Sequence, residues 1–426
     1  MFISKLKLQN FRKFEIFETE LNQQMTVLAG INGSGKSSIL DALAISMGTF
    51  MMGLDGCKSL SIAKTDALNK SFTLNDSVDL QSMYPVVISA EGELDGKKIS
   101  WKRSLNSAEG RTTKIEANEI IDISKSYQDR IRKGDATLIL PLLSYYGTGR
   151  LWAKKKQRNS TGKKANRLNG YLDCLAAETN EKLMLKWFQN MAIQEYQDAK
   201  EIRSLKAVKN AVIRCCQILT GHNEIDVIYN LSTQELDVID SSSIEGKVKF
   251  PMHELSDGYR NTISMIADIA YRMAVLNPQL NEPVKETPGI ILIDEVELHL
   301  HPQWQQIVLD MLRDIFPCVQ FIVTTQAPAV IASVHKENII LIKDESHGVQ
   351  PAEEVYGKNA DSILNAVMET SERPKRIKEM FDACHRKLDE GKIEEAERIL
   401  NELEKTIGSN DPEITSLNTS IYLEKM

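Results

Sequence analysis

The stretch that decides the fold covers residues 25–48 and reads MTVLAGINGSGKSSILDALAISMG. It begins with an apolar run typical of a buried strand, continues through a glycine-rich loop and ends with apolar residues at helical spacing. The loop, residues 30–37, satisfies the pattern G-x-x-x-x-G-K-[ST]. A strand, a glycine-rich loop and a helix in this order predict an α/β fold that binds phosphate.

Each residue type in the loop has a physical reason to be there. Gly33 and Gly35 let the main chain approach phosphate oxygens, Lys36 would reach the β and γ phosphates, and the Ser37 hydroxyl would ligate Mg²⁺. The alternative, a glycine-rich turn without chemistry, is disfavoured by the flanking strand and helix. The residues predicted to hold the nucleotide in this loop are Asn32, Gly33, Ser34, Gly35, Lys36, Ser37 and Ser38.

A second acidic strand end is expected, because a magnesium ion beside the phosphates needs a carboxylate. Residues 290–304 supply one, reading IILIDEVELHLHPQW. Asp294 is the candidate metal ligand, and Glu295 is the candidate base that orients and deprotonates the attacking water. His299 and His301 raise the alternative of a zinc site, but they lack the i, i+4 spacing of H-E-x-x-H, which favours a loop or dimer-interface role.

Composition limits the other classes of function. A net charge of −7 over 426 residues gives no general field that would attract nucleic acid. Six cysteines without a C-x-x-C pair argue against a disulfide framework and a thiolate zinc site. The chain contains neither an apolar run long enough for a membrane span nor a signal-peptide pattern at its start, so we expect a cytoplasmic protein.

The pattern along the chain predicts an organisation in four parts. Residues 1–150 form the first lobe of the head, and residues 85–105 within it read as a hairpin around Asp95 and Gly96. A Ser- and Asp-containing stretch before this hairpin reads as a loop. The other expected parts are a helical insertion at 151–223, a second lobe at 224–350 with further strands, and a helical tail at 351–426. A single tetratricopeptide-like unit in the tail is an open alternative.

The order of motifs resembles the ATPase heads of the ATP-binding-cassette type found in the structural-maintenance, RecF and overcoming-lysogenization-defect group. LQNFRKFE, residues 8–15, is similar to the opening strand of that group, which implies that Arg12 lies near the nucleotide. LSDGYRN, residues 255–261, resembles a degenerate signature motif. The resemblance implies that Ser256 and Gly258 face the γ-phosphate bound by a second subunit, so that ATP-bound heads pair as a homodimer or larger homo-oligomer.

Several longer blocks resemble a narrower bacterial family of defence-associated ATPases. They include LPLLSYYGTGRLW at 140–152 and LSDGYRNTISMIADIAYRMAVLNP at 255–278. This family includes the PtuA subunit of Septu anti-phage systems and of some retrons, which works with a separate HNH nuclease. The resemblance implies a sensor or regulatory ATPase with a PtuB-like nuclease partner. The rival interpretation is a RecF- or SMC-like repair clamp that binds DNA when ATP is present; a transporter ATPase is disfavoured because its signature reads closer to LSGGQ.

Two positions depart from the family pattern. TTQAPAV, residues 324–330, lies where the group usually reads T-T-H-S-P, so Gln326 replaces the switch histidine. Glutamine can hydrogen-bond a γ-phosphate but cannot relay a proton, which implies slow hydrolysis with Glu295 and Gln326 as the catalytic pair. Val296 and Glu297 stand where the narrower family often has Ile-Asp, a change expected to matter little.

Residues 150–167 contain eight basic residues and no acidic one. Such a segment could contact the backbone of DNA or RNA with a strong dependence on salt, or it could be a solvated loop. Arg150 also falls near the position of the group's Q-loop. The activating trigger and the size of the assembly beyond a dimer are not encoded in any pattern that we recognise.

Overall fold

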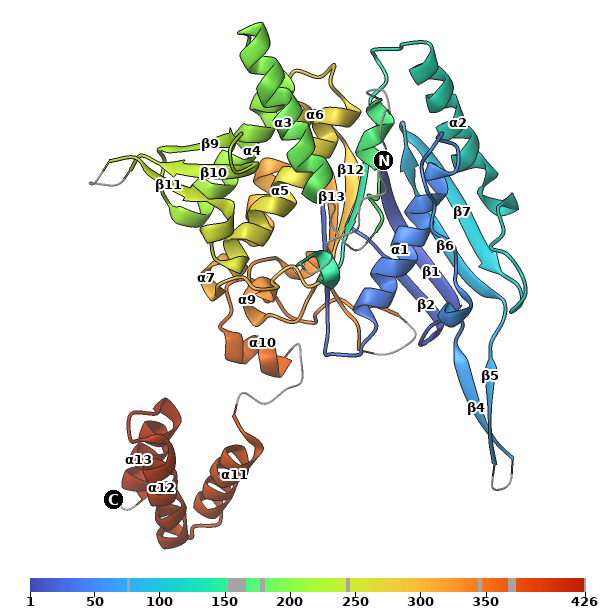
Figure 1. Ribbon diagram of the computed structural model, residues 1–426. Helices are drawn as coiled ribbons and strands as arrows, with labels where there is room; N and C mark the ends of the chain where they lie inside the picture. Colours follow the sequence, from blue (N-terminus) through green and yellow to red (C-terminus); the bar gives the residue numbers. More distant parts are fainter. Residues whose placement is uncertain are drawn as a thin grey trace. The chain divides into compact units, whose positions relative to one another are not determined.

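The computed structural model describes residues 1–74, 77–151, 166–176, 181–242, 246–343, 347–366 and 373–424. The chain divides into two compact units, Met1–Lys358 and Asn359–Met426. The larger unit contains the phosphate loop and the acidic strand end at Asp294 and Glu295, and the smaller unit consists of helices. Figure 1 shows the elements of both units.

A five-stranded parallel sheet forms the centre of the larger unit. Its order is β14 (Ile339–Leu341), β3 (Met25–Ala29), β13 (Val319–Thr325), β12 (Gly289–Ile293) and β8 (Leu142–Tyr146). Every residue of β3, β12 and β13 is buried, as expected for parallel strands covered on both faces. The predicted strand before Asp294 is therefore confirmed as β12, and both β12 and β13 run in the same direction as β3.

An antiparallel sheet lies beside this parallel one. Its order is β2 (Phe14–Glu20), β1 (Phe2–Phe11), β6 (Val86–Leu94) and β7 (Lys97–Leu105). The predicted hairpin around Asp95 and Gly96 is confirmed: both residues have positive φ, which a two-residue hairpin turn requires. Helix α1 (Lys36–Met51) runs between the two sheets, where it contacts β6, β12 and β13 (Figure 1).

Helices and a small sheet complete the larger unit. Helix α2 (Asn118–Arg132) packs on α1 and β7, α5 (Asp257–Leu276) contacts β8, and α4 (Arg203–Thr220) lies between α5 and strand β9. The three-stranded antiparallel sheet has the order β11 (Val248–Pro251), β10 (Glu235–Asp240) and β9 (Ile225–Asn230). The remaining helices are α3 (Glu181–Asp198), α6 (Pro283–Glu286), α7 (Pro302–Gln305), α8 (Val308–Ile315) and α9 (Pro328–Ile331).

One predicted loop is instead a β-hairpin. Strands β4 (Asn69–Leu74) and β5 (Ser77–Ser82) pair with each other and project from the larger unit (Figure 1). Phe72, Val78 and Leu80 on these strands are 46%, 70% and 62% exposed. The Ser- and Asp-containing composition of the segment suggested a loop, although apolar and polar residues alternate within each strand. Pairing places Phe72 beside Asp79 and Val78 beside Thr73, so neither face of the hairpin is continuously apolar.

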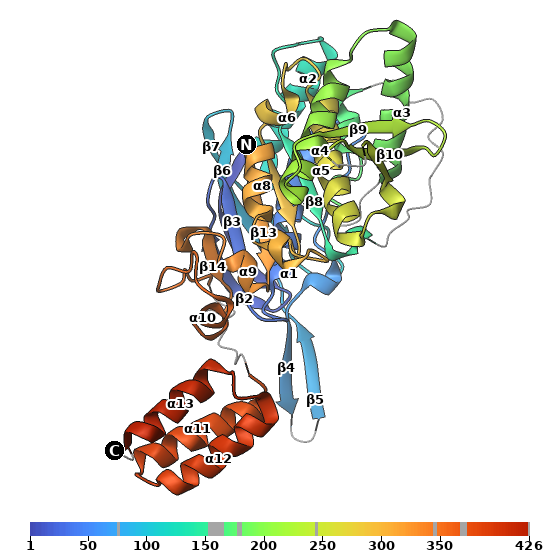
Figure 2. The same ribbon diagram turned by 90° about the vertical axis from the view of Figure 1, so that its left-hand side faces the viewer.

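The smaller unit has a hydrophobic core of its own. Helix α10 (Ala360–Ala366) precedes α11 (Lys375–Asp389), α12 (Ile393–Ile407) and α13 (Pro412–Glu424), and the last three pack side by side (Figure 2). The connections between these three helices lie around Gly391 and in the SNDPE segment that begins at Ser409. The core residues are Ile377, Phe381, Cys384, Ala396, Leu400, Leu403, Ile414, Leu417 and Ile421.

Within the described ranges, no helix combines the length and the apolar character that crossing a membrane requires.

Candidate functional site

Three loops meet at one edge of the parallel sheet. The carboxyl ends of β3, β12 and β13 lie together, because parallel strands end at the same edge of a sheet. A pocket of about 260 Å³ opens there. Its lining contains ten of the residues that the sequence singled out, together with Lys13: Arg12, Asn32, Gly33, Gly35, Lys36, Ser37, Ser38, Asp294, Glu295 and Gln326.

The shape of the phosphate loop depends on its glycines. Gly33 and Gly35 have φ values of 78° and 99°, a conformation that side chains with a Cβ rarely adopt. A Cβ on Gly35 would lie 2.5 Å from the ring of Phe14, so the turn between β1 and β2 closes against the bare main chain. Ser34, which was predicted to touch the nucleotide, is 7% exposed and does not line this pocket.

Lys36 begins helix α1 and folds back over the loop. Its Nζ donates hydrogen bonds to the carbonyl oxygens of Gly30 and Ile31, at 2.7 and 2.9 Å. The residue is only 6% exposed. Burial lowers the pKa of Lys36, and the carboxylates of Asp294, Glu297 and Glu295 oppose that shift. A buried cation within reach of these acids is placed to receive an anion that enters the pocket.

Ser37 and Asp294 supply the oxygen donors expected for a divalent metal. The Ser37 hydroxyl donates to Asp294 Oδ1 at 3.1 Å, and the Thr324 hydroxyl donates to the same oxygen at 2.6 Å. Asp294 is 4% exposed, while Ser37 faces the solvent side of the loop. A carboxylate next to a hydroxyl at the mouth of a phosphate loop fits Mg²⁺, which prefers oxygen ligands.

Glu295 and Gln326 face each other across the pocket. Gln326 Nε2 donates to Glu295 Oε1 at 3.2 Å, and the Glu295 backbone N–H donates to the Thr324 hydroxyl at 2.7 Å. Glu295 has a φ of 48°, a left-handed conformation that costs free energy for a residue with a Cβ. Such strain clusters at functional sites, and here the bond to Thr324 helps to hold it.

Arg12 lines the pocket but is already paired with two carboxylates. Its Nη1 lies 2.5 Å from Asp41, its Nε lies 3.0 Å from Asp66, and Tyr145 also donates to Asp41 at 2.8 Å. Burial acts to lower the pKa of Arg12, but the two carboxylates outweigh it and raise the pKa. The sequence singled out Arg12 but not its partners, because Asp41 and Asp66 lie far from it along the chain.

The two signature residues lie outside this pocket. Ser256 precedes helix α5 and is exposed, and its hydroxyl makes no capping hydrogen bond to that helix. Gly258 is buried, and a Cβ built on it would lie 2.4 Å from the carbonyl oxygen of His299. Within one subunit, neither Ser256 nor Gly258 therefore lines the pocket at the phosphate loop. Gly258 instead packs against His299 in the turn after β12.

The histidines of the β12 turn have local structural roles. His299 has a φ of 63°, and His301 Nδ1 accepts a hydrogen bond from the Gln303 backbone at 3.4 Å, where it caps helix α7.

Of the predicted basic segment, residues 152–165 lie outside the described residues. Arg167, at its end, is described: its guanidinium donates to the carbonyl oxygens of Leu276 and Leu138.

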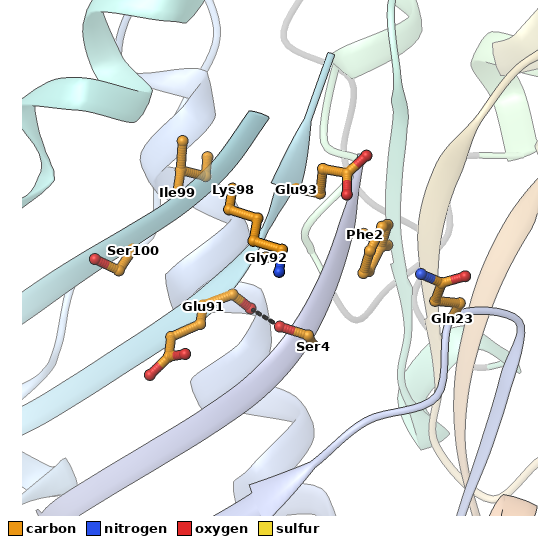
Figure 3. Close-up of a pocket in the computed structure, with 9 residues that line it drawn as sticks. All are labelled: Phe2, Ser4, Gln23, Glu91, Gly92, Glu93, Lys98, Ile99 and Ser100. Carbon is orange, nitrogen blue, oxygen red and sulfur yellow. Dashed lines mark hydrogen bonds between the residues drawn. The ribbon is translucent and has the colours of Figure 1, made fainter. Parts of the chain in front are cut away.

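A second, larger hollow lies on the antiparallel sheet (Figure 3). Its volume is about 480 Å³, and its lining includes Phe2, Ser4, Glu91, Glu93 and Lys98. The Ser4 hydroxyl donates to the Glu91 carbonyl oxygen there. No glycine-rich loop lines it, and its two carboxylates against one lysine would repel a triphosphate. The smaller pocket at the phosphate loop is therefore the candidate nucleotide site.

Two family profiles match the chain. Residues 5–214 match one described as an AAA domain, and residues 180–332 match one described as an AAA domain, putative AbiEii toxin, Type IV TA system. The match of residues 5–214 includes the phosphate loop, and the match of residues 180–332 includes the β12 turn and the segment after β13. Both profiles therefore cover parts of the same pocket.

The chain also resembles individual proteins. It is 26% identical to the Retron Vc95 probable ATPase of Vibrio cholerae serotype O1 biovar El Tor, over 87% of this chain and 80% of that protein. It is 31% identical to the Septu protein PtuA of Bacillus mycoides strain KBAB4, over 30% of this chain and 19% of that protein. A solved Smc head bound to the C-winged helix domain of ScpA superimposes with a TM-score of 0.50 and 17% identity, covering 82% of this chain and 98% of that one.

Proposed function

We propose that this homologue of the retron ATPases, which has the α/β fold of an SMC head, binds ATP with Mg²⁺ and hydrolyses it slowly to ADP and phosphate. The observation that carries the proposal is the single pocket that unites Lys36, Ser37, Asp294, Glu295 and Gln326. The AAA profiles and the names of the retron relatives indicate an ATPase.

The roles of the residues follow from their positions around this pocket. Lys36 releases its two loop carbonyls and turns toward the β and γ phosphates of ATP. Ser37 and Asp294 would hold Mg²⁺, which neutralises charge on the phosphates when bound. Glu295 orients and deprotonates the attacking water, and Gln326 donates a hydrogen bond to Glu295 from the opposite wall.

Ser256 and Gly258 suggest that the active assembly contains two heads. Because the start of α5 lies outside the pocket of its own subunit, these residues would complete the pocket of a second copy. The exposed Ser256 hydroxyl is suited to contact a γ-phosphate there. ATP would then be bound between two heads, which makes dimerisation depend on the nucleotide.

The resemblance to PtuA supports a role in defence against phage. In this proposal the head acts as the sensor or regulatory subunit of a complex, and a separate HNH nuclease cuts nucleic acid. The basic residues between 150 and 164 form the proposed contact to DNA or RNA, whereas the Arg167 guanidinium donates to backbone carbonyl oxygens of its own unit. The alternative function, a RecF- or SMC-like repair clamp, requires nucleic acid but no separate nuclease.

A pull-down from the native cell tests the proposed complex. We expect the tagged chain, captured at physiological salt with ATP present, to bring down a stoichiometric HNH nuclease that mass spectrometry identifies. Co-purified nucleic acid without a protein partner would favour the repair clamp. Nuclease activity of the isolated chain that survives Glu295→Gln would contradict the proposed division of labour.

Gln326→His is expected to raise ATP turnover several-fold. An imidazole at this position can carry charge and relay a proton, which the glutamine amide cannot do. The measurement is steady-state phosphate release at saturating ATP, with Gln326→Ala as the control that removes the amide without adding an imidazole. Turnover of the histidine variant at or below that of the unaltered chain would show that the missing imidazole does not limit the rate.

A further inference from the structure

Glu297 holds the segment that carries Gln326. Its Oε1 accepts hydrogen bonds from the backbone N–H groups of Gln326 and Ala327, at 2.7 and 3.2 Å. These bonds join the turn after β12 to the segment after β13. They come from a side chain that does not line the nucleotide pocket. Glu297 can therefore influence the pocket through its neighbours and through the charge that its carboxylate presents to Lys36.

Those neighbours include both members of the catalytic pair. Gln326 is anchored by its backbone to Glu297 and donates through its side chain to Glu295. The turn after β12 is also joined to strand β13 itself, by the backbone bond from Val296 to the Thr324 carbonyl oxygen at 3.0 Å. Glu297 supplies the contact that fixes the main chain at position 326 itself.

The second oxygen of Glu297 is unusual. Oε2 is buried and makes no hydrogen bond to any of the residues that the structure describes. Burying a carboxylate oxygen without a partner costs free energy, so this oxygen does not account for a carboxyl group at position 297 through stability. Retention of a carboxyl group here is better explained by the two backbone bonds that its other oxygen makes.

We propose that Glu297 is a positioning residue for ATP hydrolysis, which fixes the switch segment so that Gln326 faces Glu295. This inference rests on the proposed ATPase function. The proposal requires the length of a glutamate side chain at position 297. Aspartate is shorter by one methylene, about 1.5 Å of reach, which would withdraw the carboxylate from a backbone N–H now 2.7 Å away. The aspartate that the related family often has here is thus not equivalent in this chain, contrary to the expectation from sequence.

Three variants of Glu297 test the proposal. Glutamine keeps the length and the accepting oxygen but removes the charge, aspartate keeps the charge but shortens the side chain, and alanine removes both. We expect Glu297→Ala and Glu297→Asp to lower kcat by about 10- to 100-fold, since displacement of about 1 Å can have that effect on catalysis. Glu297→Gln should keep most of the kcat. ATP affinity should change much less than kcat in all three, because Glu297 does not line the pocket and acts on Lys36 only through its charge.

The pattern of results separates positioning from other roles. A merely electrostatic role would preserve activity in the aspartate variant and lose it in the glutamine variant, which would overturn the proposal. A merely structural role would make kcat follow the melting temperature across the three variants, which also would overturn it. In the double variant, Glu297→Ala should add little to the loss of kcat caused by Gln326→Ala alone, because Glu297 acts through Gln326. Losses of kcat that add up in the double variant would contradict this.

The experiment also separates this inference from the proposed function. If the unaltered chain hydrolyses ATP and Glu295→Gln stops it, while Glu297→Ala and Glu297→Asp keep full kcat, only the positioning role is wrong. If the unaltered chain shows no hydrolysis that depends on Glu295, the proposed ATPase function is wrong, and the positioning role fails with it.

Discussion

Replacing Lys36 with alanine is expected to weaken ATP binding by about 100-fold or more, because charge-assisted hydrogen bonds contribute roughly 1.5–3 kcal/mol each. Lys36 is buried in the pocket, and its Nζ donates to two carbonyl oxygens of the loop, at 2.7 and 2.9 Å. When ATP binds, Lys36 would exchange these bonds for bonds to phosphate oxygens. Among the side chains of the loop, it would therefore contribute most to ATP affinity. Isothermal titration with ATP and Mg²⁺ measures the change directly.

Lys98→Ala is the matched control for this experiment. Lys98 is an exposed lysine in the larger hollow of the antiparallel sheet, so its removal changes the net charge equally but leaves the phosphate loop intact. We expect its ATP affinity to equal that of the unaltered chain. Loss of affinity in Lys98→Ala together with unchanged affinity in Lys36→Ala would move the nucleotide site to that hollow. Thermal melting of both variants checks that each one folds.

Glu295→Gln is expected to reduce ATP turnover by roughly 100- to 10,000-fold, the contribution of a well-placed general base. Glutamine has nearly the same shape and keeps an oxygen that can accept the bond from Gln326. ATP binding should therefore persist, and the unhydrolysed nucleotide should trap a dimer. Phosphate release gives the turnover, and light scattering with ATP and Mg²⁺ gives the mass of the assembly.

Glu91→Gln serves as the control, since Glu91 is an exposed carboxylate in the larger hollow. It should hydrolyse ATP at the normal rate and should not accumulate as an ATP-bound dimer. Unchanged turnover in Glu295→Gln would remove Glu295 from the role of base. A monomer that retains ATP would instead preserve that role and contradict the proposed pairing of heads.

The fold was predictable where a motif coincides with a buried strand. Residues 25–48 and 290–295 combine apolar runs with polar ends, and parallel strands place those ends at one edge whatever lies between them in sequence. The β4–β5 hairpin was missed for the opposite reason. Its strands pair with each other but cover no core, so neither face of the hairpin is marked by a continuous row of apolar residues.

The site was predictable for residues that act through their own side-chain chemistry. Lys36, Ser37, Asp294 and Glu295 belong to patterns whose chemistry is known, and the structure brings all four to one pocket. Thr324 and Glu297 were not recognised, because they act by bonding the backbone or side chain of another residue. Such roles depend on which strands are neighbours, and no local pattern in the sequence specifies that.

The tight contact at Gly258 affects how variants of the signature motif should be read. A Cβ at this position would lie 2.4 Å from the His299 carbonyl oxygen, in the same turn that carries Glu295. An inactive Gly258→Ala protein would therefore report damage within one subunit, even if the glycine never meets a second nucleotide. Ser256 is exposed and makes no capping bond to its helix, so its hydroxyl can be removed without disturbing that turn. Genetic evidence for contact between two heads should be sought at Ser256.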